Sequence, residues 1–250
     1  MGIRFEVCCG TAEDALQAAA GGADRVELNS ALFLGGLTPS LGALQVVKAH
    51  STVPVVCMVR PREAGCCYSE GEWATMEADA RALLAAGADG LAFGFLLPDG
   101  RVDEQRTRRF VALCGEKEAV FHRAFDVTPD RDAAIQTLIA CGVRRVLTSG
   151  GAGTAMEGRE ELRRLQARYG NYIEILPGGG IRAENAAALA AYTGVSQVHG
   201  SARAVVQDTS AAGNPAIVFG GSLGGMSLPE TEFKRTDPAL VRAVKAALEK

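Results

Sequence analysis

Near the middle of the 250-residue chain lies the segment Ala119-Val120-Phe121-His122-Arg123-Ala124-Phe125-Asp126, which decides the fold. A short apolar run leads into this segment, and three ionisable side chains, His122, Arg123 and Asp126, end it. An apolar run of this length that ends in polar groups is typical of a buried strand carrying side chains to an open edge. The segment therefore predicts a strand with functional groups at its carboxyl end.

The same pattern recurs on both sides of this segment, with a helical stretch after each apolar run. The predicted strands are 4–8, 23–28, 54–59, 88–93, the segment above, 144–148, 172–176 and 197–199. Glycines at the predicted helix ends, Gly22, Gly87, Gly142 and Gly194, are each followed closely by the next strand. Eight such units in ~250 residues predict an α/β fold, a single (β/α)8 TIM barrel that forms one domain over residues 1–250. A doubly wound open sheet remains the alternative, because strand order cannot be derived from the sequence.

Short sequence motifs predict where two helices begin, and one long segment does not fit the repeating pattern. Thr38-Pro39 predicts the start of a helix that runs through Lys48, and Ser69 with Glu72 forms a capping-box pattern. Residues 204–236 predict a long irregular excursion before the C-terminal helix, because they are too long for an ordinary loop of this fold. This excursion could cover the open end of the barrel as a lid or lie on the outside.

Composition and charge limit the possible binding partners and the cellular location of the protein. A net charge of −3 and a pI near 5.7 argue against nucleic acid or a membrane surface as a partner. The chain begins directly in a strand-like run and shows no signal or membrane-spanning stretch, which predicts a cytoplasmic protein. Its seven cysteines include no C-x-x-C pair, so we expect mostly reduced thiols rather than a disulfide framework.

Charged side chains are predicted to gather at the carboxyl ends of the strands, where barrels of this kind carry function. Because alternate strand residues point inward, one pocket would collect the catalytic candidates Glu6, Glu27, Arg60, His122 and Asp126. Within it, Glu6 or Glu27 could act as general base and His122 as acid or orienting group. The alternative is a structural ion-pair network that fills the barrel.

Two glycine-containing loops form a second candidate site. Gly178-Gly179-Gly180 follows the seventh predicted strand, and Gly200-Ser201-Ala202-Arg203 follows the eighth. Loops at these two positions bind phosphate in many barrels, since glycine lets backbone N–H groups approach an anion. We therefore predict an anion site whose candidate residues are Gly178, Gly179, Gly180, Ser201 and Arg203, with plain tight-turn geometry as the alternative.

Thiols form a third candidate site. Cys8 is expected to point inward near the open end, and Cys66 and Cys67 lie on a loop that could fold over the pocket. Thiolates favour soft metals such as Cu(I), so these three cysteines are the candidate metal ligands. Packing of Cys8 as a small apolar side chain is the alternative.

The sequence resembles the CutC copper homeostasis protein family over residues 4–203. The segments that carry the resemblance are Glu6–Cys8, Gly21–Leu28, Gly35–Ser40, Met58–Arg62, Phe121–Asp126, Val146–Gly150, Leu176–Ile181 and His199–Arg203. The resemblance implies a cytoplasmic TIM barrel that forms a homodimer or higher homo-oligomer and acts in copper tolerance by binding Cu(I). It also implies copper ligands near the ends of the first two strands. Cys8 occupies the first position and Asn29 the second, so a second thiolate would have to come from Cys66 or Cys67.

Two functions therefore stay open from the sequence alone. One is a copper-handling protein that binds Cu(I) through thiols. The other is a barrel enzyme that acts on a small phosphorylated or carboxylated metabolite, with its anion site after the seventh and eighth strands. A purely scaffolding role would explain neither the glycine loops nor the charged pocket.

Overall fold

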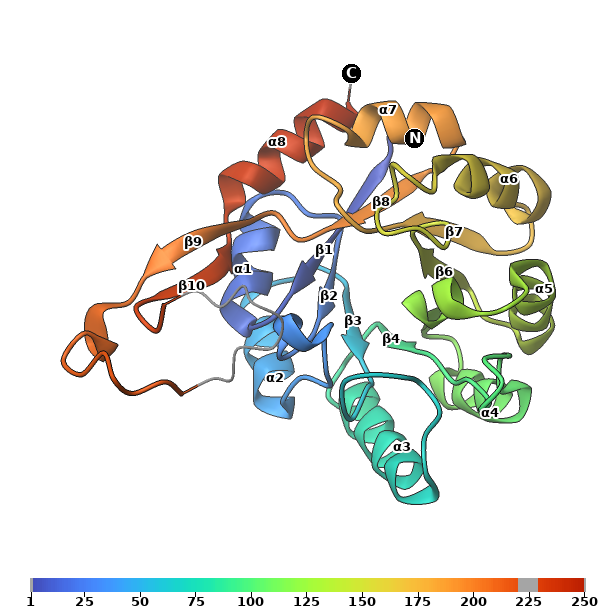
Figure 1. Cartoon of the computed structure of the whole chain (residues 1–250), viewed down its shortest axis with the longest axis horizontal. Coiled ribbons are helices and arrows are strands. Elements are labelled where there is room, and N and C mark those ends of the chain that lie inside the picture. Colours follow the sequence, from blue (N-terminus) through green and yellow to red (C-terminus); the bar gives the residue numbers. More distant parts are fainter. Residues whose placement is uncertain (1, 220–228, 250) are drawn as a thin grey trace.

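The computed structural model describes residues 2–219 and 229–249, in which eight parallel strands form an almost closed barrel surrounded by helices (Figure 1). The barrel strands are β1 (Arg4–Cys9), β2 (Arg25–Leu28), β3 (Val55–Met58), β4 (Gly90–Phe93), β5 (Glu118–Phe121), β6 (Arg145–Thr148), β7 (Glu174–Pro177) and β8 (Gln197–Gly200). Strands that alternate with outer helices make this a (β/α)8 TIM barrel, which confirms the predicted fold class.

Strand pairing decides between the barrel and the open sheet. The strand order is β7-β6-β5-β4-β3-β2-β1-β8, so β1 pairs in parallel with β2 on one side and with β8 on the other. The remaining gap, between β7 and β8, is spanned by a parallel bridge between Gly178 and His199. The first strand thus joins the last, and the doubly wound alternative is wrong.

The outer helices begin and end where local sequence chemistry favours it. They are α1 (Ala12–Ala20), α2 (Leu41–His50), α3 (Glu70–Ala85), α4 (Glu104–Cys114), α5 (Arg131–Cys141), α6 (Arg159–Tyr169), α7 (Ala186–Thr193) and α8 (Pro238–Leu248). The predicted capping box of Ser69 and Glu72 is present at α3. Gly142 and Gly194 end α5 and α7 in the left-handed conformation, with φ of 82° and 76°, which glycine adopts without steric cost.

The start of α2 differs from the prediction. The helix begins at Leu41 because the Ser40 hydroxyl accepts a hydrogen bond from the Ala43 N–H. Thr38 lies outside the helix and instead joins the open end of the barrel: its hydroxyl donates to the Arg60 carbonyl at 3.1 Å and accepts from the Arg60 N–H at 3.0 Å.

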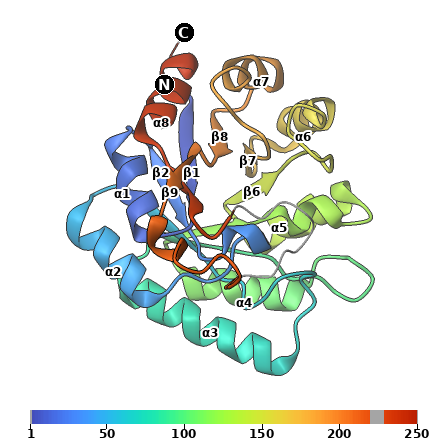
Figure 2. The same cartoon turned by 60° about the vertical axis from the view of Figure 1, so that its left-hand side comes forward.

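The excursion over residues 204–236 is more regular than predicted. Its two ends form an antiparallel ribbon of β9 (Arg203–Gln207) and β10 (Glu232–Thr236), with a short 3-10 turn over Thr209–Ala211. The ribbon extends outward beyond α1 instead of across the barrel in Figure 1, and Figure 2 shows it from the side. Its base is fixed where the Thr236 N–H donates to buried Asp14 of α1 at 2.6 Å. The glycine-rich stretch 220–225 lies outside the described residues, so the lid stays untested there.

The barrel interior is divided into an apolar and an ionic part. Val56, Met58, Ala92 and Val120, on β3 to β5, form a small buried apolar cluster. Near the amino ends of the strands lies an ionic layer made of Arg25, Glu118, Arg145, Glu174 and Gln197. The ion-pair network considered from the sequence therefore exists, but it lies mainly below the open end.

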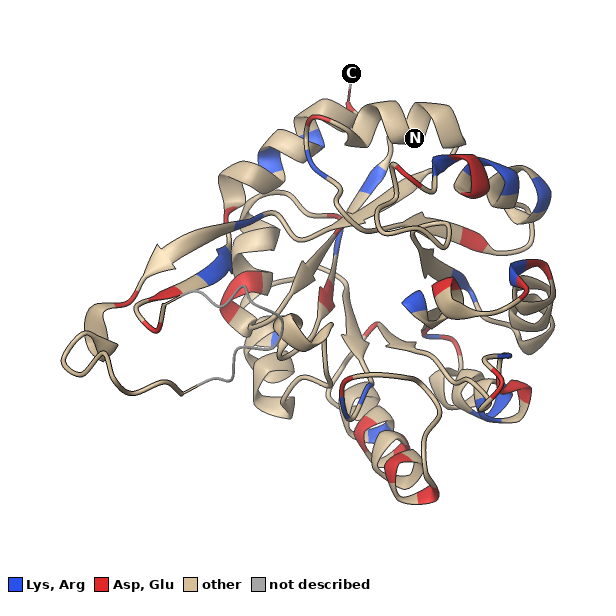
Figure 3. Cartoon of the chain, in the orientation of Figure 1, with Lys and Arg blue, Asp and Glu red and all other residues tan. Residues whose placement is uncertain are grey.

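The outer surface carries acidic and basic residues side by side over the helices (Figure 3). No helix within the described residues is both long and apolar enough to cross a bilayer.

Candidate functional site

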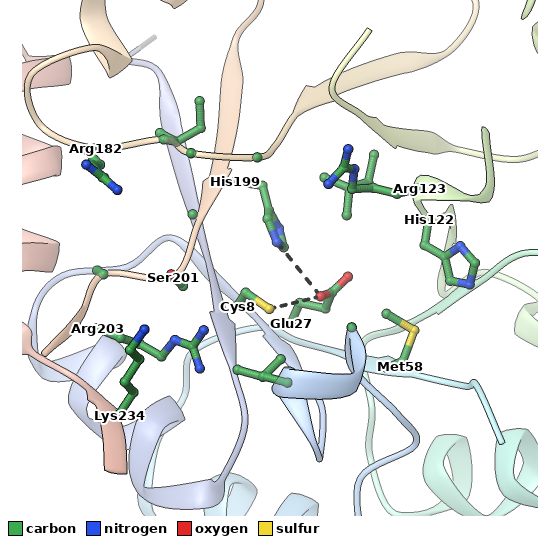
Figure 4. A pocket seen from close by; sticks show the side chains of 18 of the residues that line it. Cys8, Glu27, Met58, His122, Arg123, Arg182, His199, Ser201, Arg203 and Lys234 are labelled. Atoms are coloured by element: carbon green, nitrogen blue, oxygen red, sulfur yellow. Dashed lines mark hydrogen bonds and ion pairs between the residues drawn. The ribbon is translucent and has the colours of Figure 1, made fainter. Parts of the chain in front are cut away.

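A cavity of about 990 Å³ opens at the carboxyl ends of the strands. Its polar lining comes from the ends of β1, β2, β3, β5 and β8, from the loops after β7 and β8, and from β10 (Figure 4). The lining residues that bear on function are Cys8, Glu27, Met58, Arg60, Cys66, His122, Arg123, Gly179, Gly180, Arg182, His199, Ser201, Arg203 and Lys234. Such a volume suits a small-molecule ligand.

Cys8, Glu27 and His199 form a compact cluster in this cavity. Their ligand atoms all lie within 4.8 Å of one another. Cys8 Sγ lies 3.6 Å from Glu27 Oε2, and His199 Nε2 lies 4.0 Å from the same oxygen, as the dashed lines in Figure 4 mark. The parallel register places Cys8 opposite Glu27, and β8 brings in the imidazole from the other side of β1. A thiol, a carboxylate and an imidazole at this spacing could share one metal ion.

Glu6 lies one layer deeper and orients His199. Its carboxylate pairs with Arg25 Nε and, through Oε1, lies 2.8 Å from His199 Nδ1. Burial would raise the pKa of Glu6, but the charge of Arg25 and the contact with His199 outweigh it, so the pKa lies well below its usual range. An ionised Glu6 favours a proton on Nδ1, which leaves Nε2 facing Cys8 and Glu27. A carboxylate behind a histidine is the usual support of a metal-binding imidazole.

Burial governs the protonation of Cys8 and Glu27. It raises the pKa of the Cys8 thiol to about 12 and also raises the pKa of Glu27, despite the nearby His199 imidazole. Asn29, which is 1% exposed, fixes both side chains: its Nδ2 donates to Glu27 Oε2 at 3.0 Å and lies 3.5 Å from Cys8 Sγ. The second position that the family resemblance singled out therefore contacts Cys8 directly.

His122 occupies the opposite side of the cavity (Figure 4). Its Nδ1 accepts a hydrogen bond from the Ala124 N–H at 3.1 Å, which requires the proton on Nε2. Nε2 is buried and has no partner among the described residues. Burial, aided by the charge of Arg60, lowers the pKa of His122 to about 3. At neutral pH the ring is thus a neutral donor with a free N–H group.

Replacing His122 with Asn should reduce the sensitivity of the fold to acid. The unfolded chain takes up a proton at His122 below its ordinary pKa of 6.5, whereas the folded protein does so only near 3, so this site destabilises the fold as the pH falls through that window. Between pH 7 and pH 5, the wild type should lose about 2 kcal/mol more unfolding free energy than the variant. Urea denaturation at both pH values measures this difference, with His50→Asn, at an exposed position, as the control. Equal losses in wild type and His122→Asn would contradict the account.

Two other catalytic candidates support loops. Arg60 lines the cavity, but its guanidinium donates to the carbonyls of Leu34, Gly36 and Ala64 at 2.9–3.0 Å and so holds two rim loops together. Asp126 is not among the lining residues. Its carboxylate pairs with Arg123 and accepts from the Thr148 hydroxyl at 2.5 Å and from the N–H groups of Ser149 and Gly151.

The predicted anion-site residues lie together, with one exception. Gly179, Gly180, Ser201 and Arg203 line the cavity, while the N–H of Gly178 is used in a hydrogen bond to the Thr148 carbonyl at 3.0 Å.

The predicted metal ligands are divided between two places. Cys8 and Cys66 both line the cavity, and burial raises the pKa of the Cys66 thiol. Cys67 is exposed and lines a separate depression beside Trp73.

The candidate residues predicted from the sequence do not include His199. Alternation along β8 was the signal that could have included it, because Gln197 and His199 both point inward. Met58, Arg182 and Lys234 were missed as well. Lys234 had no sequence signal, since it belongs to a segment that was expected to be irregular.

Comparison with known proteins identifies a family and several relatives. The model of the CutC family matches residues 3–204. A CutC family protein from Treponema denticola is 48% identical over 88% of this chain and 90% of its own length. The human protein named copper homeostasis protein cutC homolog is 41% identical over 98% of this chain and 89% of its own length.

A solved structure of a CutC protein has a similar fold. The crystal structure of CutC from Streptococcus agalactiae superimposes with a TM-score of 0.76 and 31% identity, over 80% of this chain and 98% of that one. The match to the family model extends over all eight barrel strands. The chain therefore belongs to the CutC family.

Proposed function

We propose that this protein takes part in copper homeostasis by binding Cu(I) in the barrel cavity, through the Cys8 thiolate and the His199 imidazole. The observation that carries the proposal is the cluster of Cys8, Glu27 and His199 within 4.8 Å, with Glu6 behind the imidazole. Thiolate and imidazole are both good ligands for copper, and thiolate selects the Cu(I) state. Relatives whose names refer to copper homeostasis support the same role.

The electrostatics of the cluster also favour a bound cation. Cys8 and Glu27 would repel each other if both were ionised, and in the metal-free protein burial keeps the thiol protonated. Burial lowers the pKa of the His199 imidazole, but its contacts with Cys8 and Glu6 outweigh this and raise the pKa well above its usual value. A cation held by the thiolate and the imidazole would neutralise the charges of Cys8 and Glu27, at the cost of releasing one proton from the thiol and one from His199. Glu27 would then be a weak third ligand or a counter-charge, since a carboxylate is a hard ligand.

The second thiolate implied by the family resemblance is absent from this position, because Asn29 occupies it. Cys66 lies on the wall of the same cavity and is the cysteine that could supply it. A cytoplasmic location, as expected from the sequence, belongs to the same proposal, because reduced thiols are needed to hold Cu(I).

Titration of Cu(I) against a competing chelator, without oxygen, tests the proposal. Cys8→Ser should weaken binding at least about tenfold, since it removes the soft ligand. Cys67→Ser, which alters an exposed thiol outside the cavity, should leave the affinity unchanged. If Cys8→Ser binds Cu(I) as tightly as the wild type, the cavity is not the copper site.

A further inference from the structure

One wall of the cavity collects positive charge that the copper cluster does not use. Arg182, Arg203 and Lys234 lie on the same side of the cavity in Figure 4, and they come from the loop after β7, from the first residue of β9 and from β10. Within residues 2–219 and 229–249, none of the three side chains forms an ion pair, and the Nε of Arg203 is buried without a partner. Most other arginines in this part of the chain contact a carboxylate or a carbonyl.

The backbone beside this wall offers further donors. Gly179 and Gly180 line the cavity with φ of 102° and 76°, conformations that side chains rarely adopt. Their N–H groups have no acceptor among the described residues. The residues that carry these two free N–H groups, the Ser201 hydroxyl and the three cations all line the same cavity. Glu27 and Glu184 are the acidic residues in the same lining; Glu27 belongs to the copper cluster, and the Glu184 side chain is exposed.

A donor set of this composition matches one class of ligand. A phosphate group carries close to two negative charges and several acceptor oxygens, so it can satisfy cations and N–H groups together. A carboxylate has one charge and would leave part of the wall unpaired. Backbone and side-chain donors after the seventh and eighth strands are also the recurrent phosphate site of this fold.

The far side of the cavity provides a second, independent observation. The Nε2–H of His122 is buried in the lining and has no partner, which costs free energy unless a ligand supplies an acceptor. His122 lies across the cavity from Arg182, Arg203 and Lys234 (Figure 4). A ligand that reaches both sides must therefore carry an oxygen acceptor on an organic part beyond its phosphate.

We propose that the cavity binds a small organic phosphate, with its phosphate against Gly179, Gly180, Ser201, Arg203 and Lys234 and an oxygen of its organic part at His122. This site goes beyond copper binding and does not depend on it. It assigns the basic wall and the unpaired imidazole to one ligand, and the cavity volume of about 990 Å³ accommodates such a molecule.

Calorimetric titration of the metal-free protein with inorganic phosphate tests the phosphate position. The wild type should bind with a dissociation constant of about 1 mM or tighter, and Arg203→Met should weaken binding at least about tenfold. Arg81→Met removes an exposed arginine of α3 outside the cavity and should bind like the wild type. Lys234→Met gives a second, independent variant on an exposed strand, in case Arg203→Met does not fold. Absence of saturable binding, or equal weakening by Arg81→Met, would overturn the proposal.

Titration with ribose 5-phosphate tests the organic part of the ligand, because this probe adds hydroxyl and carbonyl oxygens to the phosphate. The wild type should bind it more tightly than inorganic phosphate, and His122→Phe should remove that advantage while it leaves the affinity for inorganic phosphate unchanged. If ribose 5-phosphate binds no more tightly than inorganic phosphate, or if its advantage survives in His122→Phe, the assignment of His122 is wrong. Because copper is absent throughout, these results are independent of the copper proposal.

Discussion

Replacing Asn29 with Cys should tighten Cu(I) binding about 100-fold or more, because it adds a second soft ligand beside the first. Asn29 Nδ2 already lies 3.5 Å from Cys8 Sγ, and the Asn29 backbone is fixed to β1 by a hydrogen bond from its N–H to the Cys9 carbonyl at 2.8 Å. A thiol at residue 29 would thus be held next to Cys8, and two thiolates close together suit Cu(I) better than one thiolate and an imidazole.

The control for this variant is Asn29→Ser, which has the same shape as the cysteine but no sulfur. It also removes the amide that donates to Glu27 and so accounts for any effect of the lost hydrogen bond. Chelator competition must be run with reductant, since two adjacent thiols can oxidise to a disulfide. If Asn29→Cys and Asn29→Ser bind Cu(I) equally, residue 29 does not face the copper position and the site has been misplaced.

Replacing Arg145 with Met should destabilise the fold by about 3–5 kcal/mol, the usual cost of breaking a buried ion pair from one side. The Arg145 side chain is fully buried, and its two terminal nitrogens donate to Glu118 at 2.8 and 3.0 Å. Its Nε also donates to Glu174 at 3.0 Å. Without the guanidinium, the two partly buried carboxylates would lose their closest counter-charge, and among the described residues only Arg25, 3.9 Å from Glu118, would remain as a buried cation.

Arg144 provides a matched control for this prediction. It approaches the same two carboxylates at 3.7 and 3.4 Å, but its side chain is 59% exposed. Exposed pairs contribute little, so Arg144→Met should cost less than about 1 kcal/mol. Guanidinium denaturation of both variants measures the difference. Comparable losses would show that the ionic layer at the amino ends of the strands does not behave as buried charge.

The barrel could be predicted from the sequence because its signals are local and repeated. Gly142 and Gly194 end their helices as expected, and the Ser69–Glu72 capping box forms where its pattern placed it. The start of α2 could not be predicted in the same way. Thr38 also fits a helix start, but its pairing with Arg60, 22 residues away, takes it out of the helix.

The sequence could not predict how far below the open end of the barrel each inward-pointing side chain lies. Alternation showed that Glu6 and Cys8 both point inward, but it could not say which layer each occupies. The register places Cys8 opposite Glu27 and Glu6 opposite Arg25, so Glu6 lies below the cavity and supports His199 instead of lining the opening. Of the five catalytic candidates, Glu27, Arg60 and His122 therefore line the cavity, Glu6 lies directly beneath it, and Asp126 supports the loop after β6.

Long-range contacts account for the other differences. Lys234 reaches the cavity only because β10 pairs with β9, which begins at Arg203, and no local pattern indicates this pairing. Asp126 follows a strand, as a functional carboxylate would, yet its oxygens accept hydrogen bonds from the loop after β6. Polar residues at strand ends thus divide between ligand-facing and loop-supporting roles according to partners that are distant in sequence.

The central claim is that Cys8 sulfur and a histidine nitrogen hold Cu(I) in the barrel cavity. X-ray absorption at the copper edge tests this most directly, on protein loaded with one equivalent of Cu(I) in a Cys67→Ser background that removes the exposed thiol. The account predicts sulfur and nitrogen scatterers around copper, with the sulfur signal lost on the further change Cys8→Ser. A sulfur signal that persists unchanged without Cys8 would contradict it.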